Sequence, residues 1–191
     1  KMTSFDLTQL AVQLFDAGAV RIGDIEAKMA VAKQLQLLAQ EINHELLCGV
    51  PYAALPLAAV MSVNANTPMI MRRKETKLYA TKKLLEGIYE KHQTCLVVED
   101  VVTSGGSLLE TINTLREEGL SVSHAVVVLD RGQGGVSVLK ANGVIVKSLF
   151  TLSGLVKILN NVGRINDETV EIILEHIKEC QFATKDNLTP Y

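Results

Sequence analysis

The sequence has little of what marks several classes of protein. Its 191 residues include only three cysteines, Cys48, Cys95 and Cys180, which are odd in number and widely spaced. A reducing compartment fits this usage best, and Cys48 and Cys95 are expected to be small core residues because both lie in apolar runs. The four histidines show no spacing typical of metal ligands, so a structural zinc site is not expected.

Charge of one sign and long uninterrupted apolar runs are also lacking. The formal net charge is −2, so no broad basic field attracts the chain to nucleic acid or to a membrane. The most apolar stretch, residues 46–63, is interrupted by Gly49, Pro51 and Pro56, which predicts a strand, a turn and a helix in place of a membrane span. No secretory signal precedes Thr3, so we expect a cytoplasmic protein without nucleic-acid or membrane partners.

What the sequence does contain is an alternation of strand-like and helical patterns. Runs rich in Val, Ile and Leu, as buried parallel strands are, alternate with segments of helical apolar spacing. We predict one α/β domain with a doubly wound, mostly parallel twisted sheet flanked by helices, and a site beyond the C-terminal strand ends. The predicted strands are residues 20–25, 46–50, 68–72, 94–98, 125–129 and 144–149, and the predicted helices are residues 6–17, 26–42, 57–63, 108–118, 136–141, 155–160 and 168–182.

Two details of these helices are specific enough to check. In the helix at residues 26–42, we expect Met29, Leu35, Leu38 and Ile42 on the buried side. Asn166 is predicted to cap the last helix.

The most informative segment is Glu99-Asp100-Val101-Val102-Thr103-Ser104-Gly105-Gly106-Ser107. Two carboxylates end a predicted strand, and a loop of hydroxyls and glycines then enters a predicted helix. A helix N-terminus offers unpaired amides to a phosphate, and glycine lets the backbone approach an anion closely. Carboxylates suit hydroxyl groups or a hydrated Mg²⁺, so the segment predicts a site for a sugar phosphate.

Other interpretations of this segment leave its acidic pair unexplained. No Lys-Ser or Lys-Thr pair follows the glycines, as it does in a Walker loop, and Gly-x-Gly-x-x-Gly is absent here. The purely structural alternative is a strand-to-helix turn capped by Thr103 or Ser104. We favour a site because two carboxylates facing an anion are unfavourable without a cation or donor groups.

Three further loops follow predicted strands. Residues 49–56 form either a tight loop that presents amides to an anion or a plain turn. Residues 72–77 hold four cations and begin a polar segment that is either a solvated loop or a lid long enough to close over a site. Arg131, with glycines after it, either presents its planar fork to a carboxylate or lies in a flexible surface turn.

The four loops together resemble one family. The acid pair and its Thr/Ser-Gly loop are similar to the PRPP-binding motif of type I phosphoribosyltransferases. The order Cys-Gly-Val-Pro-Tyr-x-Ala-Leu-Pro-Leu-Ala, Arg-Arg-Lys-Glu-Thr-Lys, Glu-Asp-Val-Val-Thr-Ser-Gly and Leu-Asp-Arg-x-Gln-Gly-Gly resembles orotate phosphoribosyltransferase, most closely the corresponding half of eukaryotic bifunctional UMP synthase. The resemblance implies a single domain over residues 1–191, with an N-terminal hood (1–45), a catalytic core (46–151) and C-terminal helices (152–191).

The resemblance also implies a reaction and a set of site residues. Orotate would displace pyrophosphate from C1 of PRPP with Mg²⁺ present, giving orotidine 5′-monophosphate. Catalytic roles would fall to Arg73, Lys74 and Lys77, and orotate contacts to Thr103 and Arg131. PRPP would be bound by Tyr52, Ala53, Arg73, Lys74, Lys77, Tyr79, Glu99, Asp100, Val101, Val102, Thr103, Ser104, Gly105, Gly106 and Ser107.

Metal and partners follow from the same resemblance. No side chain would ligate Mg²⁺ directly, because the substrate would hold it, near Glu99 and Asp100. The catalytic loop would reach the neighbouring subunit's site in a homodimer, and fusion to an orotidine 5′-phosphate decarboxylase domain is one arrangement that the resemblance suggests.

The sequence departs from the family pattern at three places. Many members carry Lys where Ala53 stands, and most continue Asp-x-Gly where this chain has Leu78-Tyr79-Ala80. A family segment with an orotate-facing aromatic and a PRPP-facing Lys is missing between Ile25 and Glu26. We expect that this sequence omits residues there; otherwise the enzyme is shortened and impaired.

Two alternative functions stay open at this point. A purine-type phosphoribosyltransferase shares the acid-pair motif but not the Arg-Lys-Glu-x-Lys or Asp-Arg-x-Gln-Gly segments. A non-catalytic PRPP-sensing regulatory domain would keep the phosphate loop and lose the cationic loop, and the presence of Lys74 and Lys77 disfavours it.

Overall fold

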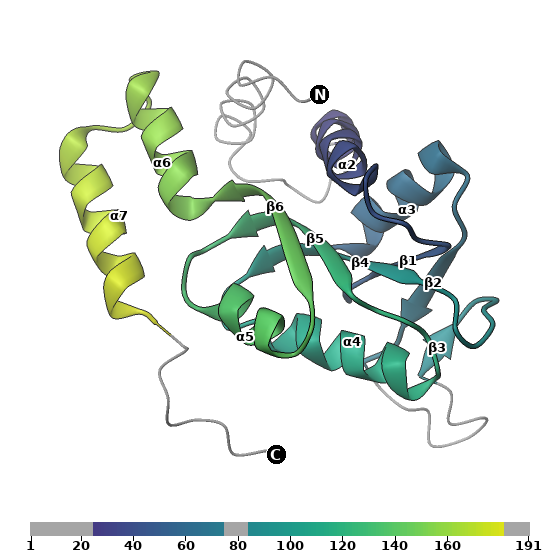
Figure 1. Ribbon diagram of the computed structural model, residues 1–191. Helices are drawn as coiled ribbons and strands as arrows, with labels where there is room; N and C mark the ends of the chain where they lie inside the picture. The colour runs from purple at the N-terminus through teal and green to yellow at the C-terminus, as the bar shows by residue number, and fades with distance from the viewer. Residues whose placement is uncertain (1–24, 75–83, 182–191) are drawn as a thin grey trace.

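A six-stranded sheet with the strand order β3-β2-β1-β4-β5-β6 forms the centre of the molecule (Figure 1). The computed structural model describes residues 25–74 and 84–181. Its elements are α2 (Ile25–Ala39), β1 (Leu46–Gly49), α3 (Leu55–Ala65), β2 (Met69–Arg72), β3 (Leu85–Glu86), β4 (Cys95–Val102), α4 (Gly106–Glu117), β5 (His124–Asp130), α5 (Gly135–Ala141), β6 (Ile145–Thr151), α6 (Leu152–Asn161) and α7 (Asp167–Glu179).

The sheet is parallel except at one edge. β1 pairs with β2 and β4, β4 with β5, and β5 with β6, all in parallel, whereas β3 pairs antiparallel with β2. The predicted fold class is confirmed. The sequence missed β3, because two residues are too few to show a periodic pattern.

Helices cover both faces of the sheet. Figure 1 shows α2 and α3 on one face and α4 and α5 on the other. Strand β4 supplies both apolar layers, with Cys95 and Val97 packed on the α4 side and Leu96 and Val98 on the opposite side. This two-sided burial explains why its sequence is an unbroken apolar run.

Helix α2 packs largely as predicted, with one exception, and Leu38 lies half-buried against the core. Leu35 and Ile42 are buried as expected, but Met29 is 54% exposed. The buried positions are Val31, Ala32, Leu35 and Ala39. At about 100° per residue, Met29 lies roughly 100° around the helix from the centre of this stripe, so it faces solvent.

The C-terminal helices form a hairpin beside the sheet (Figure 1). Asn166 caps α7 as predicted, its side-chain oxygen accepting a hydrogen bond from the Thr169 amide at 2.9 Å. The apolar stretch at residues 46–63 folds as β1, a turn and α3, also as predicted. In the described residues, we find no helix with the length and apolar character to cross a membrane.

Part of the predicted N-terminal organisation cannot be compared. The helix at residues 6–17 and nearly all of the strand at residues 20–25 lie outside the described residues. Ile25 begins α2, with Glu26 next to it in the same helix. The expected additional residues between them, and the subdivision into hood, core and C-terminal helices, stay predictions.

A close backbone contact joins α5 to the loop between β4 and α4. The Gly135 amide donates to the Thr103 carbonyl at 3.0 Å. A Cβ atom on Gly135 would lie 2.5 Å from that carbonyl oxygen and 2.8 Å from the Gly105 nitrogen. Since neither backbone atom can move without reshaping the loop, only glycine fits at this position.

We therefore expect Gly135→Ala to destabilise the fold by about 1–3 kcal/mol, as overpacking does. Gly106→Ala is the matched control, because Gly106 also begins a helix and its Cβ would meet only the Ser104 hydroxyl, at 3.6 Å. Urea unfolding should place this control within about 1 kcal/mol of wild type. Equal stabilities for the two variants would contradict the close-contact account.

Candidate active site

Strand β4 carries both acidic side chains. It extends to Val102, beyond the predicted residues 94–98, so Glu99 and Asp100 lie within the strand and not after it. The reason is pairing: Glu99 and Val102 align with Val127 and Asp130 of β5, which keeps the backbone extended. The two acidic side chains stay close to each other, because that of Asp100 acts directly on Glu99.

Glu99 is a buried carboxyl near the C-terminal end of β4, where it is 5% exposed. Its pKa is raised to about 8, chiefly by burial and also by the side chain of Asp100, although the Asp100 amide and the positive charge of Lys74 act to lower it. That amide donates to Glu99 at 3.0 Å, and the Val101 amide donates to Asp100 at 2.8 Å. Glu99 is thus a mostly protonated group near neutral pH that can donate or accept a hydrogen bond.

The loop after β4 leads into α4 without a side-chain cap. Gly105 is the N-cap residue with φ 81°, so neither Thr103 nor Ser104 caps the helix as the purely structural alternative required. The Ser104 hydroxyl accepts only from the Gly106 amide, at 3.4 Å. In the part of the chain that the structure describes, the amides of Ser107 and Leu108 have no hydrogen-bond partner.

These open amides line a small cavity of about 30 Å³. The cavity combines a buried carboxyl with the amides of a helix N-terminus, which suits a phosphate attached to a hydroxyl-bearing group. Its lining residues are Glu99, Val101, Val102, Thr103, Ser104, Gly105, Gly106, Ser107 and Leu108.

A second group of predicted residues meets beside this loop. The Lys74 ammonium, after β2, lies 5.2 Å from the centre of the Tyr52 ring, after β1. Tyr52 is 64% exposed, and Ala53 next to it is also exposed. Because the charge of Lys74 also acts on Glu99, the cation and the acidic strand share one region.

Arg73 lies at the base of the predicted catalytic loop. Its amide donates to the Leu84 carbonyl at 2.8 Å, and its guanidinium forms an ion pair with Glu86 of β3. Lys77 and Tyr79, predicted for the same loop, lie outside the described residues.

Arg131 follows β5 next to the phosphate loop. Its amide donates to the Val102 carbonyl at 3.0 Å, so the two predicted orotate contacts, Thr103 and Arg131, follow adjacent strands. The side chain is half-buried and joins no ion pair among residues 25–74 and 84–181.

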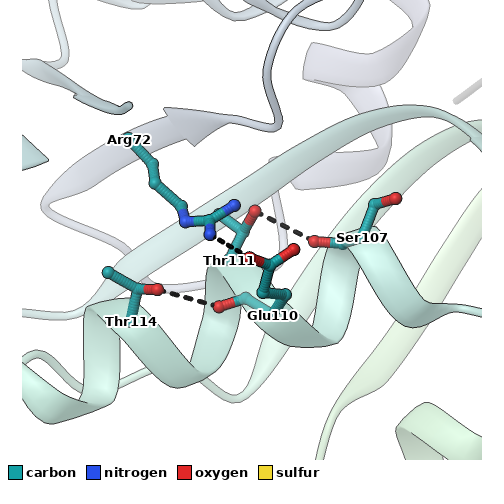
Figure 2. A network of polar contacts seen from close by, with 5 residues as sticks. All are labelled: Arg72, Ser107, Glu110, Thr111 and Thr114. Atoms are coloured by element: carbon teal, nitrogen blue, oxygen red, sulfur yellow. Dashed lines mark hydrogen bonds and ion pairs between the residues drawn. The ribbon is translucent and has the colours of Figure 1, made fainter. Parts of the chain in front are cut away.

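Sequence reasoning missed Arg72. It was grouped with the loop cations, but it is only 6% exposed and forms an ion pair with Glu110 of α4 (Figure 2). The two-residue period of β2 would have found it, because Arg72 and buried Ile70 share a face.

A larger cavity, of about 430 Å³, lies near the start of β1, at the opposite end of the strands. It contains no predicted site residue. Polar and apolar residues at the ends of α2 and α3 line it: Gln36, Ala39, Gln40, Glu41, Ile42, Asn43, His44, Leu47, Met61, Ala65 and Thr67.

Comparison with known proteins agrees with the geometry of the first cavity. The family model of the phosphoribosyl transferase domain matches residues 21–147. The chain is 49% identical over 143 residues to the uridine 5′-monophosphate synthase of Bos taurus, covering 75% of this chain and 30% of that protein. It is 38% identical over 185 residues to the orotate phosphoribosyltransferase of Chlamydia felis, covering 83% of this chain and 90% of that protein.

Solved structures give the same relationship. The UMP synthase of Leishmania donovani superposes with a TM-score of 0.80 at 25% identity, covering 90% of this chain and 42% of that chain. This chain therefore spans less than half of either UMP synthase. The Chlamydia felis match spans 185 residues but takes in only 83% of this chain, so that relative has residues within the match that this chain lacks.

The family model covers most of the chain, and its range of residues 21–147 includes the strands and loops that form the cavity. The chain belongs to the phosphoribosyltransferase family, where its relatives include orotate phosphoribosyltransferases and the corresponding part of UMP synthases.

Proposed function

We propose that this chain transfers the 5-phosphoribosyl group of PRPP to orotate, producing orotidine 5′-monophosphate and pyrophosphate. The observation that carries the proposal is the junction of β4 and α4, where a buried carboxyl adjoins open helix amides. The names of relatives that are 38% and 49% identical support orotate as the acceptor.

The C-terminal end of β4 and the loop that follows it would bind the phosphoribosyl part of PRPP. The amides and hydroxyls of Thr103–Ser107 suit the 5′-phosphate, since this helix start has no cap that competes with an anion. Glu99 and Asp100 suit the ribose hydroxyls. Thr103 and Arg131 would contact orotate, with the guanidinium on its carboxylate.

The pyrophosphate would leave toward the loops after β1 and β2. Tyr52 and Ala53 lie on the first of these loops, and Arg73, Lys74, Lys77 and Tyr79 follow β2. As the C1–O bond breaks, positive charge develops on the ribose ring and negative charge on pyrophosphate. The cations would stabilise the leaving group, while the deprotonated ring nitrogen of orotate forms the new bond to C1.

The donor set at the site fits a magnesium ion held largely by substrate. The described residues contain no cluster of three or more His, Cys, Asp or Glu that would hold a metal. Glu99 and Asp100 would lie near an ion held by the substrate phosphates, without either side chain ligating it directly. When bound, Mg²⁺ would neutralise charge on the pyrophosphate.

Assembly and location belong to the same proposal. A homodimer would let the loop that follows Lys74 reach the site of the neighbouring subunit. The UMP synthase relatives, of which this chain spans a part, support fusion to a decarboxylase domain in the natural protein. A cytoplasmic location fits the three widely spaced cysteines, none of which is disulfide-bonded in the structure.

The decisive test is an assay of the purified protein with PRPP and Mg²⁺, comparing orotate, hypoxanthine and adenine as acceptors. Of the three acceptors, we expect only orotate to be turned over, and we expect turnover to be lost when the metal is chelated. Turnover with a purine would favour the purine-type alternative. PRPP binding without any turnover would favour the regulatory domain.

Glu99 makes a pH-dependent prediction for stability. Its pKa is raised from an ordinary 4.5 to about 8, so the native state keeps a proton that the unfolded chain loses. Stability should therefore fall as pH rises from about 5 to 8, by an amount on the order of a few kcal/mol. Glu99→Gln should remove this loss.

Urea unfolding at several pH values measures that effect. The stability of Glu99→Gln relative to wild type should increase steadily with pH across this window. Glu117→Gln is the control, because Glu117 is exposed on α4 and should show a constant difference. A constant difference for Glu99→Gln as well would mean that the carboxyl is not buried as described.

Lys77→Ala tests the proposed role of the cationic loop. Because Lys77 would act on charge that develops in the transition state, we expect kcat to fall about a hundredfold with little change in PRPP affinity. Lys157→Ala, at an exposed position on α6, is the control and should leave kcat unchanged. Unchanged kcat in Lys77→Ala would refute the role.

A further inference from the structure

We propose that the ion pair between Arg72 and Glu110 positions the cations at the start of the catalytic loop against the helix that begins at the phosphate loop. Arg72 and Glu110 are then positioning residues for pyrophosphate departure. The inference rests on the proposed function and assigns a role to two residues outside the substrate-binding set.

Burial makes the pair necessary for Arg72. The guanidinium is 6% exposed, and its Nε has no hydrogen-bond partner in the described chain. Its neighbour Cys48 gives no counter-charge, because burial raises the pKa of that thiol to about 12 and keeps it neutral. A buried cation is unfavourable without an anion. Glu110, which is itself 66% exposed, supplies that anion.

The two partners belong to separate layers of the molecule. Arg72 is the last residue of β2, near the edge of the sheet, and Glu110 lies on α4, which covers one face (Figure 1). In residues 25–74 and 84–181, this pair is the one side-chain hydrogen bond or ion pair that joins β2 to α4. It therefore limits how far the end of β2 can move relative to α4.

On the β2 side, the chain continues directly into the proposed pyrophosphate cations. Arg73 is held by its amide bond to the Leu84 carbonyl, and Lys74 reaches over the Tyr52 ring. Because both side chains extend from backbone that follows Arg72, a shift of Arg72 moves both. Misplacement by about 1 Å is enough to cost a large factor in rate.

On the α4 side, Glu110 lies one turn from the phosphate loop. Figure 2 shows the Thr111 hydroxyl donating to the Ser107 carbonyl, and the Thr114 hydroxyl donating to the Glu110 carbonyl, both at 3.0 Å. Glu110 thus begins the second turn of the helix, directly after the turn that carries the open amides.

Three variants test the pair: Glu110→Gln, Arg72→Met and the double variant. Glu110→Gln leaves a buried cation without its anion, so the end of β2 must shift to hydrate it. We expect kcat/KM for PRPP to fall on the order of tenfold or more. The kcat/KM of the double variant should be no lower than that of the less active single variant, since the loss comes from one shared interaction.

The control is Glu117→Gln, which removes the same charge from the same helix. Glu117 is exposed and joins no ion pair in the described part of the chain. Its kcat/KM should stay within about twofold of wild type, as expected for a surface charge. All assays are run well below the melting temperature of each variant, so that only folded protein is compared.

Ribose 5-phosphate provides a readout that general damage to the fold would not reproduce. It lacks the pyrophosphate, so calorimetric affinity for it should stay nearly constant in Glu110→Gln while affinity for PRPP falls. Equal losses of affinity for the two ligands would overturn the proposal. So would a wild-type kcat/KM in both single variants. A kcat/KM in the double variant that is lowered by the product of the two single effects would overturn it as well. Absence of orotate turnover in wild type would defeat the proposed function, and the two affinities would still decide on the positioning role.

Discussion

The site depends on where strand β4 is held. Parallel hydrogen bonding to β1 on one side and β5 on the other fixes its register. Apolar side chains on both of its faces anchor it between the two helical layers. Since Glu99 lies in this strand and the phosphate loop begins where it ends, neither can move without breaking the centre of the sheet.

Two ionisable side chains near the site, Glu99 and Arg72, are buried where water is largely excluded. Glu99 responds by a raised pKa, and Arg72 by pairing with Glu110. Burying such groups costs free energy that the surrounding apolar core must offset. The open amides at Ser107 and Leu108, next to these groups, favour binding of an anionic ligand without reorganisation of the backbone.

Local pattern was enough to predict most of the fold. Long apolar runs and helical spacing gave the strands and helices, and Asn166 was identified as a cap. Pairing between distant segments was not visible, so the sequence could not show that β4 continues through Glu99 to Val102. The same limit explains the missed strand β3, whose two residues owe their conformation to β2.

The site residues were predictable as motifs, but their supports were not. Residues 99–107 and Lys74 stood out by type and spacing, and the structure brings them into one region. Gly135 and Arg72 belong to two of the quoted motifs, but residue type and spacing did not predict their supporting roles. Their importance comes from a 2.5 Å approach to the Thr103 carbonyl and from an ion pair across layers, both of which exist only after folding.

The central claim is that the start of α4 binds the phosphate of the substrate. Amide chemical shifts recorded by NMR during titration with ribose 5-phosphate test it most directly. The account predicts that the largest shifts occur at Ser104–Ser107 and Leu108, which line the small cavity. If the largest shifts occurred at Gln40 and His44, in the cavity at the opposite end of the strands, they would contradict it.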